Sequence, residues 1–217
     1  MLFIQRFFDG DPMPAVIQAL VVIFSICCHE FAHAWTALKQ GDSTAADAGH
    51  LTLNPMKQMG VFSLVTLLIL GISWGAVPVN PSRMKHKYSE MLVSFAGPAM
   101  NLLLFVGFTL AYVINLDFLH NPGLKLLTET GAILNVVLFV FNLLPMPPLD
   151  GWSVFGPWLR RYLNFNSEWV KGTTIFLVML VVIFSKYLFV MGWVIFDVSA
   201  YLFQLLLVNG IGFHPGA

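Results

Sequence analysis

The chain has 217 residues, of which 58% are hydrophobic and only 10% are charged, and its formal net charge is zero. Soluble domains carry about 25% charged residues, so the composition excludes an ordinary soluble domain and indicates a polytopic membrane protein. The neutral balance gives no indication of a nucleic-acid partner. The two cysteines, Cys27 and Cys28, are neighbours in an apolar run, and we expect them to be small packing residues.

Five apolar stretches follow one another along the chain. They are Ala15–Leu38, Val61–Val79, Met91–Leu116, Gly131–Leu144 and Thr173–Val208. A helix needs about 20 residues to cross a bilayer. The first and third stretches suffice alone, and the fourth suffices if it begins near Leu126. The last is long enough for two spans, with a break near Lys186 or Met191-Gly192. The sequence therefore predicts an all-α protein with about five to six transmembrane helices.

The second stretch, Val61–Val79, differs from the others in its second half. From Gly71 to Pro81 it contains two glycines, two prolines and alternating valines, a pattern that indicates extended chain turning back. Non-helical backbone at membrane depth persists only where protein or a water-filled cavity satisfies it. We therefore expect a re-entrant or β element between the first span and the next, with one plain transmembrane helix as the alternative.

A metal-binding pattern lies inside the first apolar run, where His29-Glu30-Phe31-Ala32-His33 forms an HExxH motif. On a helix this spacing places two imidazoles one turn apart on the same face. Two such histidines can bind Zn²⁺, and the glutamate can take a proton from an activated water. Ionisable groups inside a membrane segment are costly and usually mark function. Hydrolysis within or beside the membrane is the expected activity.

A catalytic zinc site usually has three protein ligands, so one more is needed. The best candidate is Asp150, where the run Asn142–Gly151 contains three prolines and ends in Asp-Gly. For His29 and Asp150 to meet, their helices must run in the same direction, and Met91–Leu116 must cross in the opposite one. Val61–Val79 must then return to the side on which it started. The zinc hypothesis thus requires the re-entrant element that the glycines and prolines already suggest.

Positive charge is distributed unevenly in this topology. The side of the proposed ligands carries Lys39, Lys57, Arg83, Lys85, Lys87, Arg160, Arg161 and Lys171, and the other side only Arg6 and Lys125, with Lys186 unassigned. Cytoplasmic loops are enriched in Lys and Arg. We therefore expect a multi-pass protein of the cell membrane whose active site faces the cytoplasm.

Several motifs give the chain a resemblance to a known family. They are His29-Glu30-Phe31-Ala32-His33-Ala34-Trp35, Gly49 to Pro55, Pro78-Val79-Asn80-Pro81, Ala96-Gly97-Pro98-Ala99-Met100-Asn101, and Asn142 to Gly151. The chain resembles the site-2 protease family of intramembrane zinc metalloproteases, in particular its small prokaryotic members without PDZ or CBS domains. The resemblance covers roughly Ala15 to Gly156. One departure is His50, where many such sequences carry arginine; we expect His50 and Asn54 to organise a loop.

The resemblance implies a role for each of five residues. His29, His33 and Asp150 would bind one Zn²⁺ per chain. Glu30 would be the catalytic base, and Asn142 would help to hold the substrate or the developing oxyanion. The chain would form a single metalloprotease domain over 1–217, with a catalytic core of about 15–156 and a C-terminal helical hairpin of about 173–208. Its partners would be the lipid bilayer and a transmembrane protein or peptide substrate, while the oligomeric state stays open.

Structural explanations for these residues stand beside the functional ones. Asp150 could be a turn residue before a glycine, and Asn142 could bond its own broken helix. We expect Asn101 and Asn135 to bridge helices. Two other functions also remain open: a metal-ion transporter that uses His29, His33 and Asp150 as a transit site, and a non-catalytic binder of membrane segments.

Overall fold

The computed structural model describes residues 3–8, 10–159 and 167–211, and within these ranges the chain is helical and contains no β-strand. The elements in chain order are η1 (Phe3–Phe7), α1 (Met13–Lys39), α2 (Thr44–Asp47), α3 (Pro55–Gln58), α4 (Gly60–Leu70), η2 (Pro81–Arg83), α5 (Ser89–Ile114), η3 (Asn115–Leu119), α6 (Pro122–Asn142), α7 (Asp150–Leu159) and α8 (Ser167–Ile211). The expected all-α class is thus confirmed.

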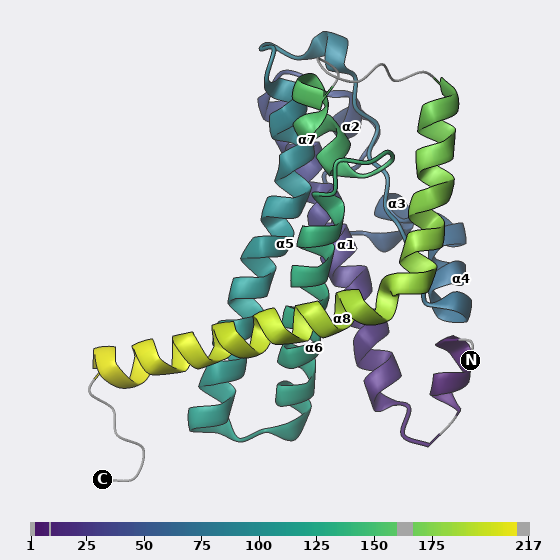
Figure 1. Ribbon diagram of the computed structural model, residues 1–217. Helices are drawn as coiled ribbons and strands as arrows, with labels where there is room; N and C mark the ends of the chain where they lie inside the picture. Colours follow the sequence, from purple (N-terminus) through teal and green to yellow (C-terminus); the bar gives the residue numbers. More distant parts are fainter. Residues whose placement is uncertain (1–2, 9, 160–166, 212–217) are drawn as a thin grey trace.

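Among the described residues, four helical stretches are long and apolar enough to cross a membrane. They are Met13–Lys39, Ser89–Leu119, Pro122–Asn142 and Lys186–Leu207. The sequence predicted about five to six. The hairpin expected over about 173–208 is not formed, because α8 continues through this range as one bent helix (Figure 1). A single glycine such as Gly192 costs a helix only about 1 kcal/mol, so it does not by itself end one.

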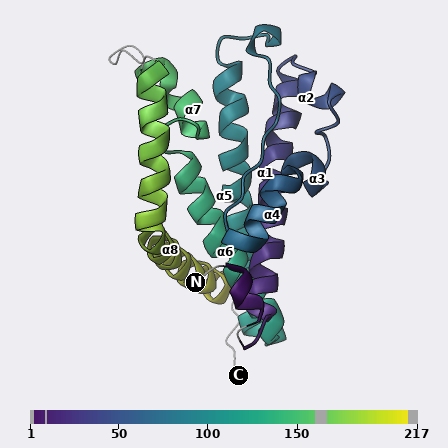
Figure 2. The ribbon, with the colours of Figure 1, turned by 90° about the vertical axis from the view of Figure 1, so that its right-hand side faces the viewer.

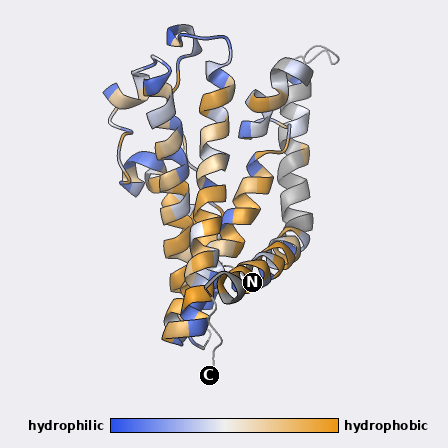
Figure 3. Ribbon diagram, turned by 90° about the vertical axis from the view of Figure 1, so that its left-hand side faces the viewer, coloured by the Kyte–Doolittle hydropathy of each residue, from blue (hydrophilic) through white to orange (hydrophobic). Residues whose placement is uncertain are grey.

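Three helices, α1, α5 and α6, form the centre of the bundle. In Figure 1, α1 and α6 run in the same direction and α5 runs in the opposite one. This is the arrangement that a shared site on α1 and after α6 requires. Figure 2 shows α2 and α3 beside α1, α4 crossing in front of α1, and the first half of α8 on the side of the bundle away from α2 and α3. Figure 3 shows hydrophobic residues along the helices and hydrophilic loops at the end where α5 begins.

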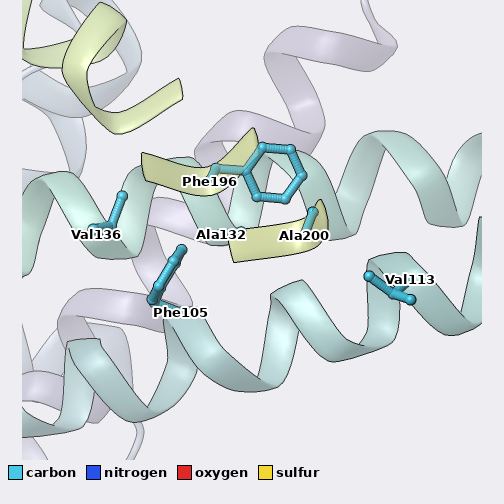
Figure 4. Packing of buried hydrophobic residues seen from close by; sticks show 6 residues of the cluster. All are labelled: Phe105, Val113, Ala132, Val136, Phe196 and Ala200. Carbon is cyan, nitrogen blue, oxygen red and sulfur yellow. The ribbon is translucent and has the colours of Figure 1, made fainter. Parts of the chain in front are cut away.

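The second half of α8 packs across α5 and α6. Figure 4 shows the contact, a cluster in which Phe196 and Ala200 of α8 meet Phe105, Val113, Ala132 and Val136. Tyr112 adds an edge-to-face contact with Phe196, with the ring centroids 4.9 Å apart. This contact holds α8 against α5 and α6. Its residues are apolar and lie far along the chain from the HExxH motif, so they contribute no polar groups to the site.

The chain between α4 and α5 is extended and returns toward the end of α1. Helix α4 ends at Leu70 and is capped by Gly71, whose φ of +77° is the left-handed conformation that glycine adopts without strain. Gly71 lies against Phe3, which packs on Ala15 near the start of α1. At the other end of the segment, the amide of Asn80 donates to Asp42 Oδ2 at 2.6 Å, just beyond α1. The segment therefore runs back along most of α1.

The expected β part of this element is corrected by the structure. No strand pairs with the extended segment within the described residues. Helical residues hold it instead, because Ser63 Oγ bonds both the amide and the carbonyl of Trp74, and the amide of Ala76 donates to the carbonyl of Gln58. One edge of the extended segment is thus hydrogen-bonded to α3 and α4. The polar atoms of these helices take the place of a partner strand.

Candidate metal centre

His29, His33 and Asp150 meet at one point inside the bundle. His29 and His33 face the same side of α1, about 15 Å and about 9 Å from its C-terminal end at 1.5 Å per residue, and each is only 7% exposed. Their Nε2 atoms are 2.9 Å apart. Asp150, the first residue of α7, places Oδ2 3.0 Å from His29 Nε2 and Oδ1 3.3 Å from His33 Nε2. The three side chains form a possible metal-binding group.

The outer nitrogen of each imidazole has a fixed partner. His33 Nδ1 lies 2.7 Å from the carbonyl oxygen of Val93, which can only accept, so this nitrogen must donate. His29 Nδ1 lies 2.6 Å from Oδ1 of Asn101. Both partners belong to α5. In the neutral imidazole with its proton on Nδ1, each Nε2 carries a lone pair, and each lies close to a carboxylate oxygen of Asp150.

This arrangement fits a metal ion. When both imidazoles are neutral, two nitrogen lone pairs and a carboxylate converge there, and a cation at the centre removes their mutual repulsion. Tetrahedral zinc with ligands at about 2.0–2.1 Å separates its ligand atoms by about 3.3 Å. The observed separations of 2.9, 3.0 and 3.3 Å lie at or slightly below that value. Gly97 of α5 leaves room for the two imidazoles, because a Cβ at this position would collide with the Nε2 atoms of both His29 and His33.

A loop between α6 and α7 brings Asp150 to the histidines. Helix α6 ends at Asn142, and α7 begins at Asp150 after the proline-rich segment. Gly151 closes the loop, since a Cβ at this position would collide with the backbone carbonyls of Leu143 and Leu144. Only glycine allows α7 to start this close to the end of α6. The Asp-Gly pair is therefore a device for positioning the carboxylate and more than a simple turn.

A cavity of about 370 Å³ opens beside the three ligand atoms. Its polar lining consists of His29, Glu30, Ser73, Asn101, Asn142 and Asp150, and its apolar walls include Ile26, Trp74, Leu138, Phe141 and Leu149. Glu30 is 7% exposed, and its carboxyl lies against the α-carbon of Gly75, where a Cβ would collide with it. The segment after α4 thus passes directly over Glu30.

Asn142 also lines this cavity, while its Nδ2 donates to the carbonyl of Leu138 one turn earlier at 3.0 Å. The amide therefore satisfies its own helix end and faces the site at the same time. His50 and Asn54 lie in the loop before α3: Gln58 Nε2 donates to the carbonyl of His50, and Asn54 caps α3 through the amide of Met56. Their expected loop-organising role is confirmed.

Sequence reasoning missed two residues that support the histidines. Asn101 was expected to bridge helices, and it does bond Asn135 on α6, but its contact with His29 was not anticipated. Gly97 was part of a recognised motif without an assigned contact. A helical signal was available, because Gly97 and Asn101 are four residues apart and so share one face of α5.

Two relatives match most of the chain. "Putative zinc metalloprotease YwhC" of Bacillus subtilis is 38% identical over 187 residues, which are 81% of this chain and 84% of the relative. "Putative zinc metalloprotease Rip2" of Mycolicibacterium smegmatis is 35% identical over 198 residues, 83% of this chain and 74% of the relative. The chain belongs to this family of zinc metalloproteases. The names of these relatives agree with the family that the motifs resemble. Zinc is the metal that both the names and the His29–His33–Asp150 group indicate.

No family model matches the chain. No solved structure matches it either. The family assignment therefore depends on the identity to the named relatives over 81% and 83% of the chain. The roles of individual residues depend on the geometry described above.

Proposed function

We propose that the chain is an intramembrane zinc metalloprotease of the site-2 type, which hydrolyses peptide bonds in or near transmembrane segments. The observation that carries this proposal is the position of the site. His29, Glu30 and His33 are buried in a helix apolar enough to span a bilayer, and Asp150 reaches the two histidines from the start of α7, after the loop that follows α6. Polar groups in such a setting mark function.

His29, His33 and Asp150 would hold the zinc ion, which supplies Lewis acidity that activates water and polarises the scissile carbonyl. Glu30, which lines the same cavity, would accept the proton of the attacking water and pass it to the leaving amine. Asn142 has a second amide hydrogen beyond the one that bonds Leu138, and it would donate this hydrogen to the developing oxyanion.

The extended segment after α4 is suited to receive the substrate. The amides of Trp74 and Ala76 face α3 and α4, and successive amides of an extended chain point in opposite directions. Within the described residues, the amides of Gly75 and Val77 make no backbone hydrogen bond. We propose that an unwound substrate segment pairs with this free edge, next to Glu30, by strand addition.

The expected location follows from charge. Among the described residues, the end of the bundle that holds α2, η2 and the start of α5 carries Lys39, Arg83, Lys85 and Lys87, whereas Arg6 and Lys125 lie near the other end. Positive residues accumulate on the cytoplasmic side. We propose a multi-pass protein of the cell membrane whose cavity opens toward the cytoplasm and whose partners are the bilayer and a transmembrane protein or peptide.

Cleavage of a synthetic transmembrane peptide by the purified full chain in detergent tests the proposal. Glu30→Gln should lower the rate at least about 100-fold, the lower end of the contribution of a general base, while bound zinc stays at one ion per chain. Glu129→Gln on α6, outside the cavity lining, is the matched control and should cleave as the wild type does. Full activity of Glu30→Gln with zinc bound would exclude the mechanism. Zinc flux into lipid vesicles that contain the purified chain, without peptide cleavage, would favour a transporter.

A further inference from the structure

A network of hydrogen bonds between buried side chains lies behind the metal centre and joins the three central helices. Asn101 Nδ2 on α5 donates to Asn135 Oδ1 on α6 at 3.0 Å. Asn135 Nδ2 donates in turn to Ser25 Oγ on α1 and to the carbonyl of Gly131, both at 2.8 Å. The side chains of Ser25, Asn101 and Asn135 are 0% exposed. His29 lies at the end of this network, bonded to Asn101.

In each hydrogen bond of this network, the chemistry of the groups decides which atom donates and which accepts. The carbonyl of Gly131 can only accept, so Asn135 must turn its NH₂ toward it. Asn135 Oδ1 then faces Asn101 and can only accept, so Asn101 must present its own NH₂ there. This leaves Asn101 Oδ1 for His29, whose Nδ1 must therefore carry the proton. The carbonyl of Gly131 thus fixes the orientation of the Asn135 amide, which fixes that of the Asn101 amide and so the position of the His29 proton. We call these two amides the relay.

We propose that Asn135 is a positioning residue of the metal centre: by orienting Asn101 it keeps the proton of His29 on Nδ1 and the lone pair of Nε2 toward the metal. This inference rests on the proposed zinc site. His33 needs no such relay, because its Nδ1 bonds the Val93 carbonyl directly. An Asn101 free to rotate could present its NH₂ to His29, and the imidazole would then carry its proton on Nε2, where the metal binds.

Zinc affinity of the purified full chain, measured by competition with a chelator in detergent, tests the relay. Asn135→Leu should weaken zinc binding about 10-fold, the lower end of the effect of a lost outer partner. The absorption spectrum of the Co²⁺-substituted protein should change as well, since it reports ligand geometry directly. Asn115→Leu is the control: Asn115 is equally buried, but it bonds the amide and carbonyl of Asn121 in the α5–α6 connection. It should leave zinc affinity unchanged.

A rescue variant separates orientation from packing. In the Asn135→Leu background, Asn101→Asp should restore zinc affinity to within about threefold of the wild type, because a carboxylate can only accept and needs no orienting partner. If Asn135 only fills space, this second change restores nothing, and the proposal is overturned. Should Asn135→Leu not fold, Asn135→Thr serves in its place, since its side chain is one bond shorter and its hydroxyl can still bond Gly131.

The relay and the zinc site fail in different ways. A wild-type chain that binds no zinc, or a His29→Ala variant that binds it as tightly as the wild type, would overturn the site itself. Tight zinc binding by the wild type and by Asn135→Leu alike, with loss in His29→Ala, would overturn the relay alone.

Discussion

Gly97 offers the sharpest test of the metal centre, because the structure shows no room for a single added methyl group. A Cβ at this position would collide with the Nε2 atoms of His29 and His33. Neither ring can turn away freely, since Asn101 and the carbonyl of Val93 hold the Nδ1 atoms. Gly97→Ala must therefore break both hydrogen bonds or push α5 away from α1.

The size of the effect follows from those two bonds. Each side-chain hydrogen bond contributes about 0.5–1.5 kcal/mol net. Losing both costs about 1–3 kcal/mol, which corresponds to zinc binding roughly 5- to 150-fold weaker. Chelator competition on the purified variant measures this directly, and peptide cleavage should fall in parallel at limiting zinc.

Gly107→Ala is the matched control on the same helix, because no heavy atom lies within 4 Å of the Cβ that it would add. Both variants gain helix propensity of up to about 1 kcal/mol, so a general effect on α5 would appear in each. Equal zinc affinity in Gly97→Ala and Gly107→Ala would refute the argument that the two imidazoles bind the metal against α5.

Three further variants probe the parts around the ligands. Gly151→Ala should weaken zinc binding by more than about 10-fold in chelator competition, because its Cβ collides with the end of α6 and displaces the carboxylate beside it. Gly75→Ala should lower cleavage by about 10- to 100-fold while zinc affinity stays within threefold, since its Cβ meets the proposed base and no ligand. Asp42→Asn should destabilise the chain by about 1.5–3 kcal/mol in thermal unfolding. Burial raises the pKa of the Asp42 carboxyl, but hydrogen bonds from Thr44 and Asn80 outweigh it and hold that pKa below its ordinary value. The stabilisation is therefore present above about pH 4 and disappears as the pH falls further, and the Asn variant should lack this dependence.

The HExxH ligands could be predicted because their geometry is local. Four residues of helix place His29 and His33 on one face whatever surrounds them. Asp150 lies 121 positions beyond His29, and it was reached only through topology, since the span count and direction had to bring both to one side. The structure brings Asp150 beside both histidines, and the parallel course of α1 and α6 agrees with the direction that the reasoning required. That the three residues bind a metal stays a prediction.

Other features depend on contacts that sequence pattern does not encode. The extended segment was expected from its glycines and prolines, but its partners were not, because Ser63 and Gln58 look like ordinary polar residues of short helices. Helix α8 contains no proline that would mark its bend in the sequence. A hairpin was therefore predicted where one bent helix continues.

The site also shows how an apolar bundle can hold so many polar groups. Among the described residues, no buried side-chain nitrogen or oxygen lacks a partner. The NH₂ groups of Asn101 and Asn135 and the Nδ1 atoms of both ligand histidines all donate to fixed acceptors, two of which are the backbone carbonyls of Val93 and Gly131. With the donors committed in this way, only acceptor atoms face the point where the ligands meet. An anion would be repelled there and a cation attracted, so the arrangement of donors favours a metal ion at this point before any substrate enters the cavity.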